Sequence, residues 1–296
     1  MNYKSGFVTI IGRPNVGKST LTNDILGEKI AIMSNKPQTT RNKIHAIYNT
    51  EGAQVIFIDT PGIHKPKNKL GEYMVTEATE TLNEVDVVVF MVDESTEIGP
   101  GDKFILESLR EVKTPVILAI NKIDLLTPEA YKALFDQYSE YEFINYVMGI
   151  SAVQNKNVEA LLNKIIDLLP EGPMLYPDDM ITDQPERVIV SEIIREKILH
   201  YIDDEIPHGV AVEIDRMKKR NGKDIIDISA TIVCEKKSHK GIIIGKSGRK
   251  LKGIGKSSRE DIERLLGSRV FLELWVKVRE GWRDDESMLK GFGYRK

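Results

Sequence analysis

The segment of this sequence that carries the most structural information runs from residue 12 to residue 19: Gly12-Arg13-Pro14-Asn15-Val16-Gly17-Lys18-Ser19. It fits the pattern G-x-x-x-x-G-K-[ST], follows a Val- and Ile-rich run, and precedes a helical stretch that includes Thr20. Such a loop wraps a phosphate with backbone N–H groups, and the helix N-terminus favours the anion. We expect Lys18 to reach the β- and γ-phosphates of a nucleotide and Ser19 to bind Mg²⁺. The alternative is a glycine-rich turn with a solvated lysine.

Three further motifs each follow a predicted strand: Asp59-Thr60-Pro61-Gly62, Asn121-Lys122-Ile123-Asp124 and Ser151-Ala152. A carboxylate at Asp59 can hold Mg²⁺ through water, and the N–H of Gly62 can contact the γ-phosphate and sense its loss. The carboxylate of Asp124 suits guanine, whose N1–H and N2 amine both donate, whereas adenine would leave it unpaired. We expect Ser151 and Ala152 to support the base. The four motifs together predict a guanine nucleotide site.

Short apolar runs alternate with helical stretches over the first 170 residues. Fully buried strands read as continuous apolar runs, so we expect parallel strands at 7–11, 54–58, 85–92, 116–120 and 146–150, with an edge strand at 44–48. Helices are expected near 18–26, 72–82, 103–111, 128–138 and 158–169. The alternation predicts a doubly wound, mostly parallel α/β sheet, in which ligands bind beyond the carboxyl ends of the strands.

The stretch from Pro170 to Arg187 holds four prolines and three aspartates, which is typical of a linker. We therefore expect a nucleotide-binding domain at 1–170, a linker at 171–187 and a second domain at 188–296. In that second domain we expect a helix at 192–204, strands at 210–217 and 225–234, two helices around a glycine loop, and a final strand at 270–278. This order of elements matches a small α+β domain, the type II KH fold.

The glycine loop of the second domain is expected to bind RNA through Ile244, Gly245, Lys246, Ser247, Gly248, Arg249 and Lys250. In KH domains a G-x-x-G loop clamps the nucleic-acid backbone, which comes close because glycine carries no side chain. Between residues 235 and 259 there are nine Lys and Arg but one acidic residue, so positive charge is concentrated at the motif. An ordinary helix–loop–helix turn is the alternative. Trp275 and Trp282 either stack bases or, as we favour, pack in the core and at the domain edge.

At these motifs the chain resembles the translation-factor-related (TRAFAC) GTPases, and within them the bacterial Era family. Residues 36–42, Lys-Pro-Gln-Thr-Thr-Arg-Asn, resemble the first switch of that family. There Thr40 closes on Mg²⁺ in the GTP state, with Thr39 as the competing candidate. The resemblance implies a Ras-like P-loop GTPase domain followed by a type II KH domain.

One departure from the Ras pattern bears on hydrolysis. Ile63 stands where Ras-like proteins carry a water-orienting glutamine, so the resemblance implies the hydrophobic-substituted class of GTPases. In relatives of that class the asparagine corresponding to Asn15 helps to bind K⁺, which can stabilise charge beside the phosphates. We expect slow, K⁺-stimulated hydrolysis that depends on Lys18, Thr40, Gly62 and Asn15. The alternative for Asn15 is a local backbone hydrogen bond.

The resemblance covers essentially the whole chain. It implies a GTPase that binds small-subunit ribosomal RNA near its 3′ end and assists assembly of the small ribosomal subunit. It also implies a cytoplasmic protein with a peripheral fraction on the inner face of the cell membrane; we expect a monomer and no DNA partner. The rival hypothesis is a signalling GTPase whose C-terminal domain binds protein. A nucleotide kinase and a tRNA-modifying GTPase are weaker alternatives.

Composition sets further bounds. The longest apolar run, 85–92, is interrupted by Asp86 and falls short of the ~18–20 residues that span a bilayer. No signal peptide is expected, and the single cysteine, Cys234, excludes an internal disulfide. The net charge of −3 hides an asymmetry, because residues 188–296 hold 24 Lys and Arg against 18 Asp and Glu. Opposite charges in the two parts suggest a different partner for each.

Overall fold

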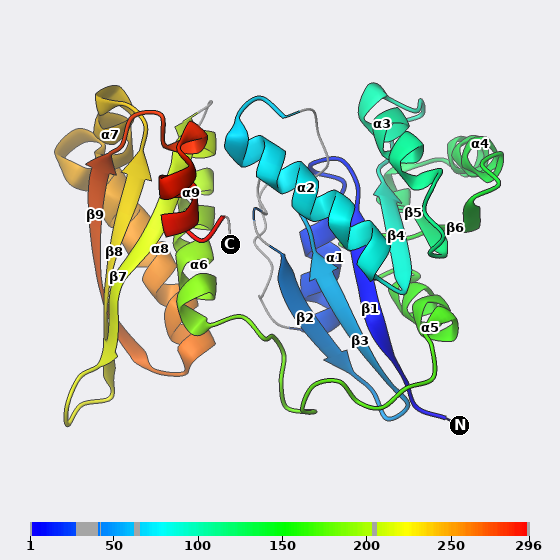
Figure 1. Cartoon of the computed structure of the whole chain (residues 1–296), viewed down its shortest axis with the longest axis horizontal. Coiled ribbons are helices and arrows are strands. Elements are labelled where there is room, and N and C mark those ends of the chain that lie inside the picture. Colours follow the sequence, from blue (N-terminus) through cyan, green and yellow to red (C-terminus); the bar gives the residue numbers. More distant parts are fainter. Residues whose placement is uncertain (1, 28–40, 42, 62–65, 203–205, 295–296) are drawn as a thin grey trace. The chain divides into compact units, whose positions relative to one another are not determined.

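In a computed structural model of the chain, the structure describes residues 2–27, 41, 43–61, 66–202 and 206–294. They form two compact units, shown in Figure 1. The first unit comprises Met1–Pro66 and Gly71–Asp183, and the second comprises Lys67–Leu70 and Gln184–Lys296. Within the described ranges, every helix is too short or too polar to span a bilayer.

The first unit is built on a six-stranded sheet of order β2-β3-β1-β4-β5-β6. All neighbouring strands are parallel except β2 and β3, which are antiparallel. The elements in chain order are β1 (Lys4–Ile11), α1 (Lys18–Leu26), β2 (Ile44–Asn49), β3 (Ala53–Asp59), α2 (Lys69–Glu84), β4 (Val87–Val92), α3 (Pro100–Leu109), β5 (Val116–Ile120), the 3₁₀ turn η1 (Ile123–Leu125), α4 (Pro128–Ser139), β6 (Ile144–Gly149) and α5 (Val158–Leu168). The predicted doubly wound α/β fold is confirmed, with β2 as the edge strand.

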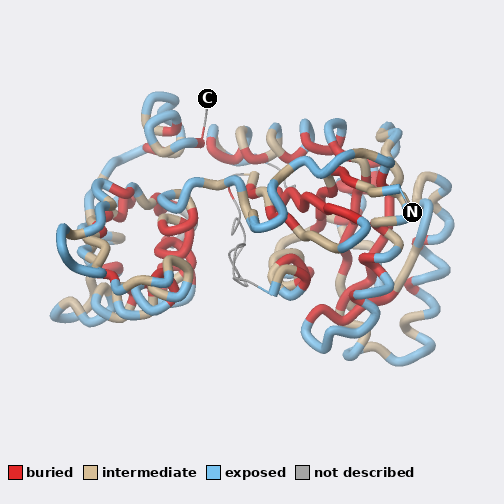
Figure 2. Tube along the Cα trace, turned by 90° about the horizontal axis from the view of Figure 1, so that it is seen from below, coloured by how far each residue is buried: buried red, intermediate tan, exposed pale blue. Residues whose placement is uncertain are grey.

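Helices cover both faces of this sheet. One core cluster joins apolar side chains of α1 and α5 to the sheet, and a second joins those of α2, α3 and α4 to the opposite face. Every residue of β3, β4 and β5 is buried, and these strands form the buried interior of the unit in Figure 2. Because they are covered on both faces, they read as continuous apolar runs in the sequence.

Several predicted boundaries differ from the structure by a few residues, and for two of them the structure shows the physical reason. β4 begins at Val87 rather than at residue 85, because Asp86 serves the neighbouring strand: its carboxylate accepts a hydrogen bond from the backbone N–H of Phe7, 2.8 Å away. α3 begins at Pro100 rather than at residue 103. Proline is suited to the first turn of a helix, because its missing N–H has no intrahelical partner there.

The segment predicted as a linker, 171–187, makes specific contacts within the first unit. The fully buried side chain of Gln54 donates to the carbonyl oxygen of Tyr176 at 2.8 Å and accepts from its backbone N–H at 2.9 Å. The backbone N–H of Ile47 donates to the carbonyl oxygen of Ile181 at 2.9 Å. Much of the segment is therefore held against β2 and β3 by hydrogen bonds.

The second unit is a three-stranded sheet of order β7-β8-β9, with β7 and β8 antiparallel and β8 and β9 parallel. Its elements in chain order are α6 (Glu186–Tyr201), η2 (Ile206–Gly209), β7 (Val210–Lys219), β8 (Ile225–Cys234), α7 (Lys237–Ile244), η3 (Lys246–Gly248), α8 (Arg249–Leu266), β9 (Arg269–Val278), η4 (Trp282–Asp284) and α9 (Glu286–Gly291). Side chains of α6, α7 and α8 share one core cluster with the sheet. The predicted α+β order is confirmed, although α6 begins six residues before the predicted position.

Candidate nucleotide and nucleic-acid sites

The backbone of the loop between β1 and α1 packs closely against a neighbouring side chain and contains residues with positive φ. Asn15 adopts a left-handed conformation with φ 71°, and Gly17 has φ 106°. A Cβ atom at Gly17 would lie 2.3 Å from the side-chain nitrogen of Asn121, so only glycine fits there. The loop is therefore packed directly against the end of β5, and Ser19 and Thr20 follow in the first turn of α1.

Lys18 folds back over this loop. Its ammonium group donates to the carbonyl oxygens of Gly12 and Arg13, each 2.9 Å away. Burial lowers the pKa of Lys18 to about 8, an effect that the nearby carboxylate of Asp59 opposes. A bound anion would stabilise the charged ammonium further, so the position fits a phosphate-binding role.

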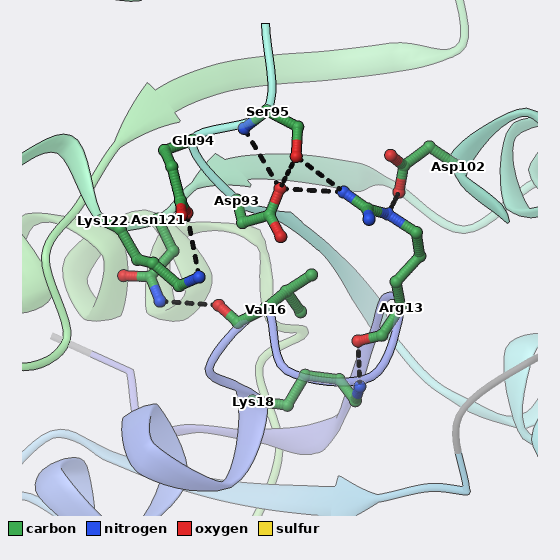
Figure 3. A network of polar contacts seen from close by, with 9 residues as sticks. All are labelled: Arg13, Val16, Lys18, Asp93, Glu94, Ser95, Asp102, Asn121 and Lys122. Atoms are coloured by element: carbon green, nitrogen blue, oxygen red, sulfur yellow. Dashed lines mark hydrogen bonds and ion pairs between the residues drawn. The ribbon is translucent and has the colours of Figure 1, made fainter. Parts of the chain in front are cut away.

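Arg13 ties the loop to β4 and α3, as Figure 3 shows. Its guanidinium donates from Nε to Asp102 and from Nη2 to Asp93, both at 2.8 Å. Asp102 is only 1% exposed, and burial raises its pKa against the opposing effect of Arg13. Burial also acts to raise the pKa of Asp93, but hydrogen bonds from Ser95 and the charge of Arg13 hold it below the ordinary value. Neither aspartate could be found from the sequence, because no motif links them to residue 13.

Asn121 joins three of the predicted motifs. Its side-chain amide donates to the carbonyl oxygen of Val16 at 2.7 Å and accepts from the N–H of Ala152 at 3.0 Å. The hydrogen bond to Val16 is also drawn in Figure 3. The phosphate loop, the end of β5 and the loop after β6 therefore meet at one buried side chain.

The other residues of these motifs lie around that junction. Lys122 has φ 62°, and its ammonium lies 2.9 Å from a carboxylate oxygen of Glu94. Asp124 lies in η1 and is exposed, so its carboxylate is accessible to a ligand. The hydroxyl of Ser151 accepts a hydrogen bond from the N–H of Gln154 at 3.2 Å.

The end of β3 offers oxygen atoms beside Lys18. Asp59 and Thr60 are buried, and within the described ranges the Thr60 hydroxyl has no hydrogen-bond partner. Pro61 follows, whereas Gly62, Ile63, Thr39 and Thr40 lie outside the described residues. The described chain contains no group of three or more His, Cys, Asp or Glu that could hold a metal ion. A hydroxyl at Ser19 and a carboxylate at Asp59 are nevertheless suitable donors for Mg²⁺, which retains water and phosphate ligands.

The G-x-x-G loop of the second unit joins α7 to α8. Gly245 has φ 71°, and a Cβ atom there would lie 2.9 Å from the Cβ of Lys250. Lys246, Ser247, Arg249 and Lys250 are exposed, whereas Ile244 and Gly248 are half-buried. Four of the seven predicted RNA-binding residues therefore present accessible side chains.

A groove of about 830 Å³ runs from this loop between α8 and β9. One wall carries four exposed basic side chains: Arg249, Lys252, Lys256 and Arg259. Their spacing of three, four and three residues places them in one stripe along the helix. The other wall is apolar and includes Val270, Phe271, Leu272 and Leu274.

Such a groove fits a nucleic-acid strand whose phosphates meet the basic wall and whose bases meet the apolar wall. Of this stripe, only Arg249 was among the predicted RNA-binding residues, and Lys252, Lys256 and Arg259 were not predicted. Their helical periodicity with Arg249 was the signal that could have found them.

The two tryptophans have different environments. Trp282 is fully buried, donates from Nε1 to the carbonyl oxygen of Gly209 at 3.0 Å, and packs against Phe292 and Tyr294. The expectation of core packing is confirmed for Trp282. Trp275 is 62% exposed, so packing in the core was the wrong expectation for this residue.

Comparison with known proteins identifies both units. A family model described as "50S ribosome-binding GTPase" matches residues 7–122, and a KH domain model matches residues 205–283. The chain is 66% identical over 294 residues to GTPase Era of Alkaliphilus oremlandii, covering 99% of this chain and 100% of the relative. It is 61% identical over 295 residues to GTPase Era of Clostridioides difficile, covering 99% of each protein.

Two solved structures match with a TM-score of 0.95 and 40% identity, covering 99% of this chain and 100% of each of those chains. One is a variant of Era from Aquifex aeolicus bound to GDP and AlF4⁻. The other is Era in complex with MgGDPNP and nucleotides 1506–1542 of 16S ribosomal RNA. With a phosphate loop, guanine-type motifs and a KH domain in one chain, and with this similarity over its whole length, the chain belongs to the Era family of GTPases.

Proposed function

We propose that the chain is a GTP-hydrolysing switch that binds small-subunit ribosomal RNA near its 3′ end and assists assembly of the small ribosomal subunit. The observation that carries the RNA-binding part is the groove of about 830 Å³ between α8 and β9, which begins at the G-x-x-G loop and is lined by four cations on one wall. Support for the choice of RNA is the similarity to Era in complex with nucleotides 1506–1542 of 16S ribosomal RNA.

In this proposal the loop from Gly12 to Ser19 binds the phosphates, with Lys18 as its principal cation. Asn121 fixes the loop against the base site through its bonds to Val16 and Ala152. Asp124 accepts from the guanine edge, and Lys122, Ser151 and Ala152 complete the base site. The buried Thr60 follows Asp59 at the phosphate end of the site.

Ser19, Asp59 and either Thr40 or Thr39 would hold Mg²⁺. When bound, Mg²⁺ supplies positive charge to the β- and γ-phosphates. Ile63 cannot orient water by hydrogen bonding, so we propose that Asn15 helps to hold K⁺ beside the phosphates. The left-handed φ of 71° at Asn15 is consistent with a specialised loop position.

The proposed switch couples the two activities. GTP and Mg²⁺ order Thr40 and the Asp59–Gly62 segment, and hydrolysis releases that order. The nucleotide state then sets how accessible the groove between α8 and β9 is to RNA. A switch of this kind requires GTP to favour one state by several kcal/mol.

We also propose a nucleotide-binding domain at 1–170, a linker at 171–187, whose last two residues begin α6, and an RNA-binding domain at 188–296. We also propose a cytoplasmic monomer with a peripheral fraction at the inner membrane face. Family resemblance alone supports the membrane fraction. A DNA partner is not part of the proposal.

Binding of RNA by the full-length chain tests the proposal. The probe is a labelled RNA of nucleotides 1506–1542, titrated with protein, Mg²⁺ and a non-hydrolysable GTP analogue while fluorescence anisotropy is measured. Gly245→Asp/Gly248→Asp should abolish binding, because it places two carboxylates where phosphates approach. The matched control is Gly267→Asp/Gly291→Asp, which adds the same charge where an added Cβ has open space, and Gly267 has a φ of +60°, close to those of Gly245 and Gly248.

The salt dependence of binding separates RNA recognition from the signalling hypothesis. Because the groove cations would neutralise phosphates, affinity for RNA should fall steeply as salt rises. Equal affinity for the two double variants, together with no salt dependence, would refute the RNA-binding function and favour a protein-binding C-terminal domain.

A further inference from the structure

Strand β9 presents two large aromatic rings to solvent. Burial alternates along this strand: Val270 lies in the core of the unit with Leu272 and Leu274 packed against it, and the intervening residues face away. Phe271 and Trp275 lie on that outward side, 50% and 62% exposed. Single exposed rings are common on protein surfaces, but two on one face of the same strand form a candidate contact surface.

The neighbours of these rings on β8 are small or polar, so nothing large and apolar covers the rings from that strand. Ile228, Ala230 and Ile232 of β8 point into the core, which leaves the intervening residues on the outward side. In the parallel register, the outward residues of β9 pair with those of β8 as Phe271 with Asp227, Glu273 with Ser229, and Trp275 with Thr231. We call the surface formed by these six residues the β9 platform.

Charged side chains surround the platform. The guanidinium of Arg220 lies 5.7 Å from the centre of the Phe271 ring and also pairs with Asp227. Lys218 pairs with Asp227 in the register of β7 and β8, and Lys277 follows Trp275 by two residues on the same side of β9.

Acidic groups are present as well. Glu273 lies between the two rings along β9, Glu213 pairs with Thr231, and Asp215 accepts a hydrogen bond from the Thr231 hydroxyl at 2.9 Å. Cations and carboxylates therefore both lie near each end of the platform, with Glu273 between the two rings. Carboxylates can accept hydrogen bonds from the exocyclic amines of bases.

We propose that the β9 platform is a second RNA-binding surface, on which bases of single-stranded RNA stack on Phe271 and Trp275. Isolated rings set among polar side chains suit base stacking, whereas a protein-docking surface would present a more continuous apolar core. Four residues of strand separate the two rings by about 13 Å, which leaves space for nucleotides between the stacked bases. RNA-binding sheets of other folds use exposed aromatics in the same way.

The platform is continuous with the groove already described, because Phe271 also lines that groove. A strand held at the G-x-x-G loop can run along α8, pass Phe271 at the edge of the sheet, and continue onto the outward face. The inference rests on the proposed RNA-binding function and extends it. A G-x-x-G loop clamps four nucleotides, and the platform would bind further nucleotides beyond its reach.

The experiment measures affinity and tryptophan fluorescence of the full-length chain with RNA of nucleotides 1506–1542 and with versions shortened stepwise from either end. All titrations contain Mg²⁺ and a non-hydrolysable GTP analogue. Trp275→Ala and Phe271→Ala should each weaken binding of the longest RNA about tenfold, whereas Trp275→Phe should bind nearly as well as the native chain. One shortened RNA should lose this sensitivity, because it no longer reaches the platform.

Fluorescence gives a readout that a purely structural role would not change. Trp282 is buried and Trp275 is exposed, so RNA should quench the native chain and should leave Trp275→Phe almost unquenched. The matched control is Phe104→Ala, because Phe104 is an exposed aromatic, 47% accessible, in the first unit. Its affinity and quenching should equal those of the native chain.

The outcomes distinguish the platform from the function on which it rests. Loss of binding in Gly245→Asp/Gly248→Asp, with native affinity of the platform variants and no quenching at Trp275, would overturn the platform and leave the proposed function intact. Absence of RNA binding by the native chain would overturn both. Native affinity of Trp275→Ala for free RNA, with weakened binding to intact small ribosomal subunits, would identify a protein as the occupant and overturn the proposal.

Discussion

Replacing Arg13 with glutamine tests whether the phosphate loop is held by the buried ion pairs at β4 and α3. A glutamine at this position would keep a polar side chain but lose the guanidinium that bonds Asp93 and Asp102 at 2.8 Å each. Asp102 is 1% exposed, so water cannot replace that partner fully. The substitution removes one side of a largely buried pair and leaves the other side in place.

The expected cost is about 3 kcal/mol of unfolding free energy. Removing one partner of a buried pair typically costs about 3–5 kcal/mol, and the 27% exposure of the Arg13 side chain favours the lower end. Without Arg13, burial raises the pKa of Asp102 further. Because the folded-state pKa then exceeds the unfolded-state pKa, stability falls as pH rises from the lower of these two values to the higher. Acidification through that interval should therefore restore up to about 1.4 kcal/mol per pH unit to the variant.

Urea unfolding followed by far-UV circular dichroism measures this cost, as a midpoint shift of about 1.5 M for a slope near 2 kcal/mol/M. Both tryptophans, Trp275 and Trp282, lie in the second unit, so their fluorescence follows that unit and should report no shift. The control is Arg110→Gln, which breaks an exposed pair with Glu107 on α3 and should cost less than about 0.5 kcal/mol. Equal midpoints for the Arg13 and Arg110 variants would refute the reasoning.

Three further predictions concern single side chains. Gly17→Ala should weaken GDP binding at least about 100-fold in fluorescence titration, because its Cβ would collide with Asn121, whereas Gly27→Ala, with open space at φ 66°, should bind normally. Asp124→Asn should weaken GTP binding by about 100-fold or more without lowering the melting temperature, because the carboxylate is exposed and its expected partner is guanine. The thiol of Cys234 should react with a thiol reagent at pH 8 at least about 100 times more slowly in the native chain than in urea. Burial shields this thiol and raises its pKa, so little reactive thiolate is accessible. Equal labelling rates, measured by absorbance, would contradict the last prediction.

Much of the fold could be predicted because its strands are buried on both faces. β5 was predicted at its observed bounds from a run of five apolar residues, and α1 was predicted from its position after the phosphate loop. The start of β4 was predicted wrongly because a side chain there makes a hydrogen bond to a neighbouring strand. That side chain is Asp86, and its role depends on Phe7, which is 79 residues away in the sequence.

The clustering of the four motifs was predictable, because they all lie at the carboxyl ends of strands that share one edge of the sheet. Asn121 confirms the reasoning, since one amide joins the phosphate loop to the loop after β6. The anchoring of Arg13 was not predictable, because Asp93 and Asp102 lie 80 and 89 residues away and carry no motif.

The groove between α8 and β9 was predicted only at its first turn. The basic stripe from Arg249 to Arg259 can be seen in the sequence. That it forms one wall of a groove can be known only once β9 is placed as the other wall. The exposure of Trp275 could have been predicted from strand alternation, because Glu273 and Lys277 lie on the same side of β9, whereas Val270 and Leu274 lie on the other. The packing of Val270 in the core of the unit bears out that assignment.

The most direct test of a nucleotide-driven RNA switch is the affinity of the full-length chain for RNA of nucleotides 1506–1542 in three states: with a non-hydrolysable GTP analogue, with GDP, and without nucleotide. Salt, Mg²⁺ and protein concentrations are held constant, because binding that depends on groove cations is sensitive to salt. If the chain is such a switch, its affinity with the GTP analogue should differ at least tenfold from its affinity with GDP. Equal affinity in all three states would contradict it.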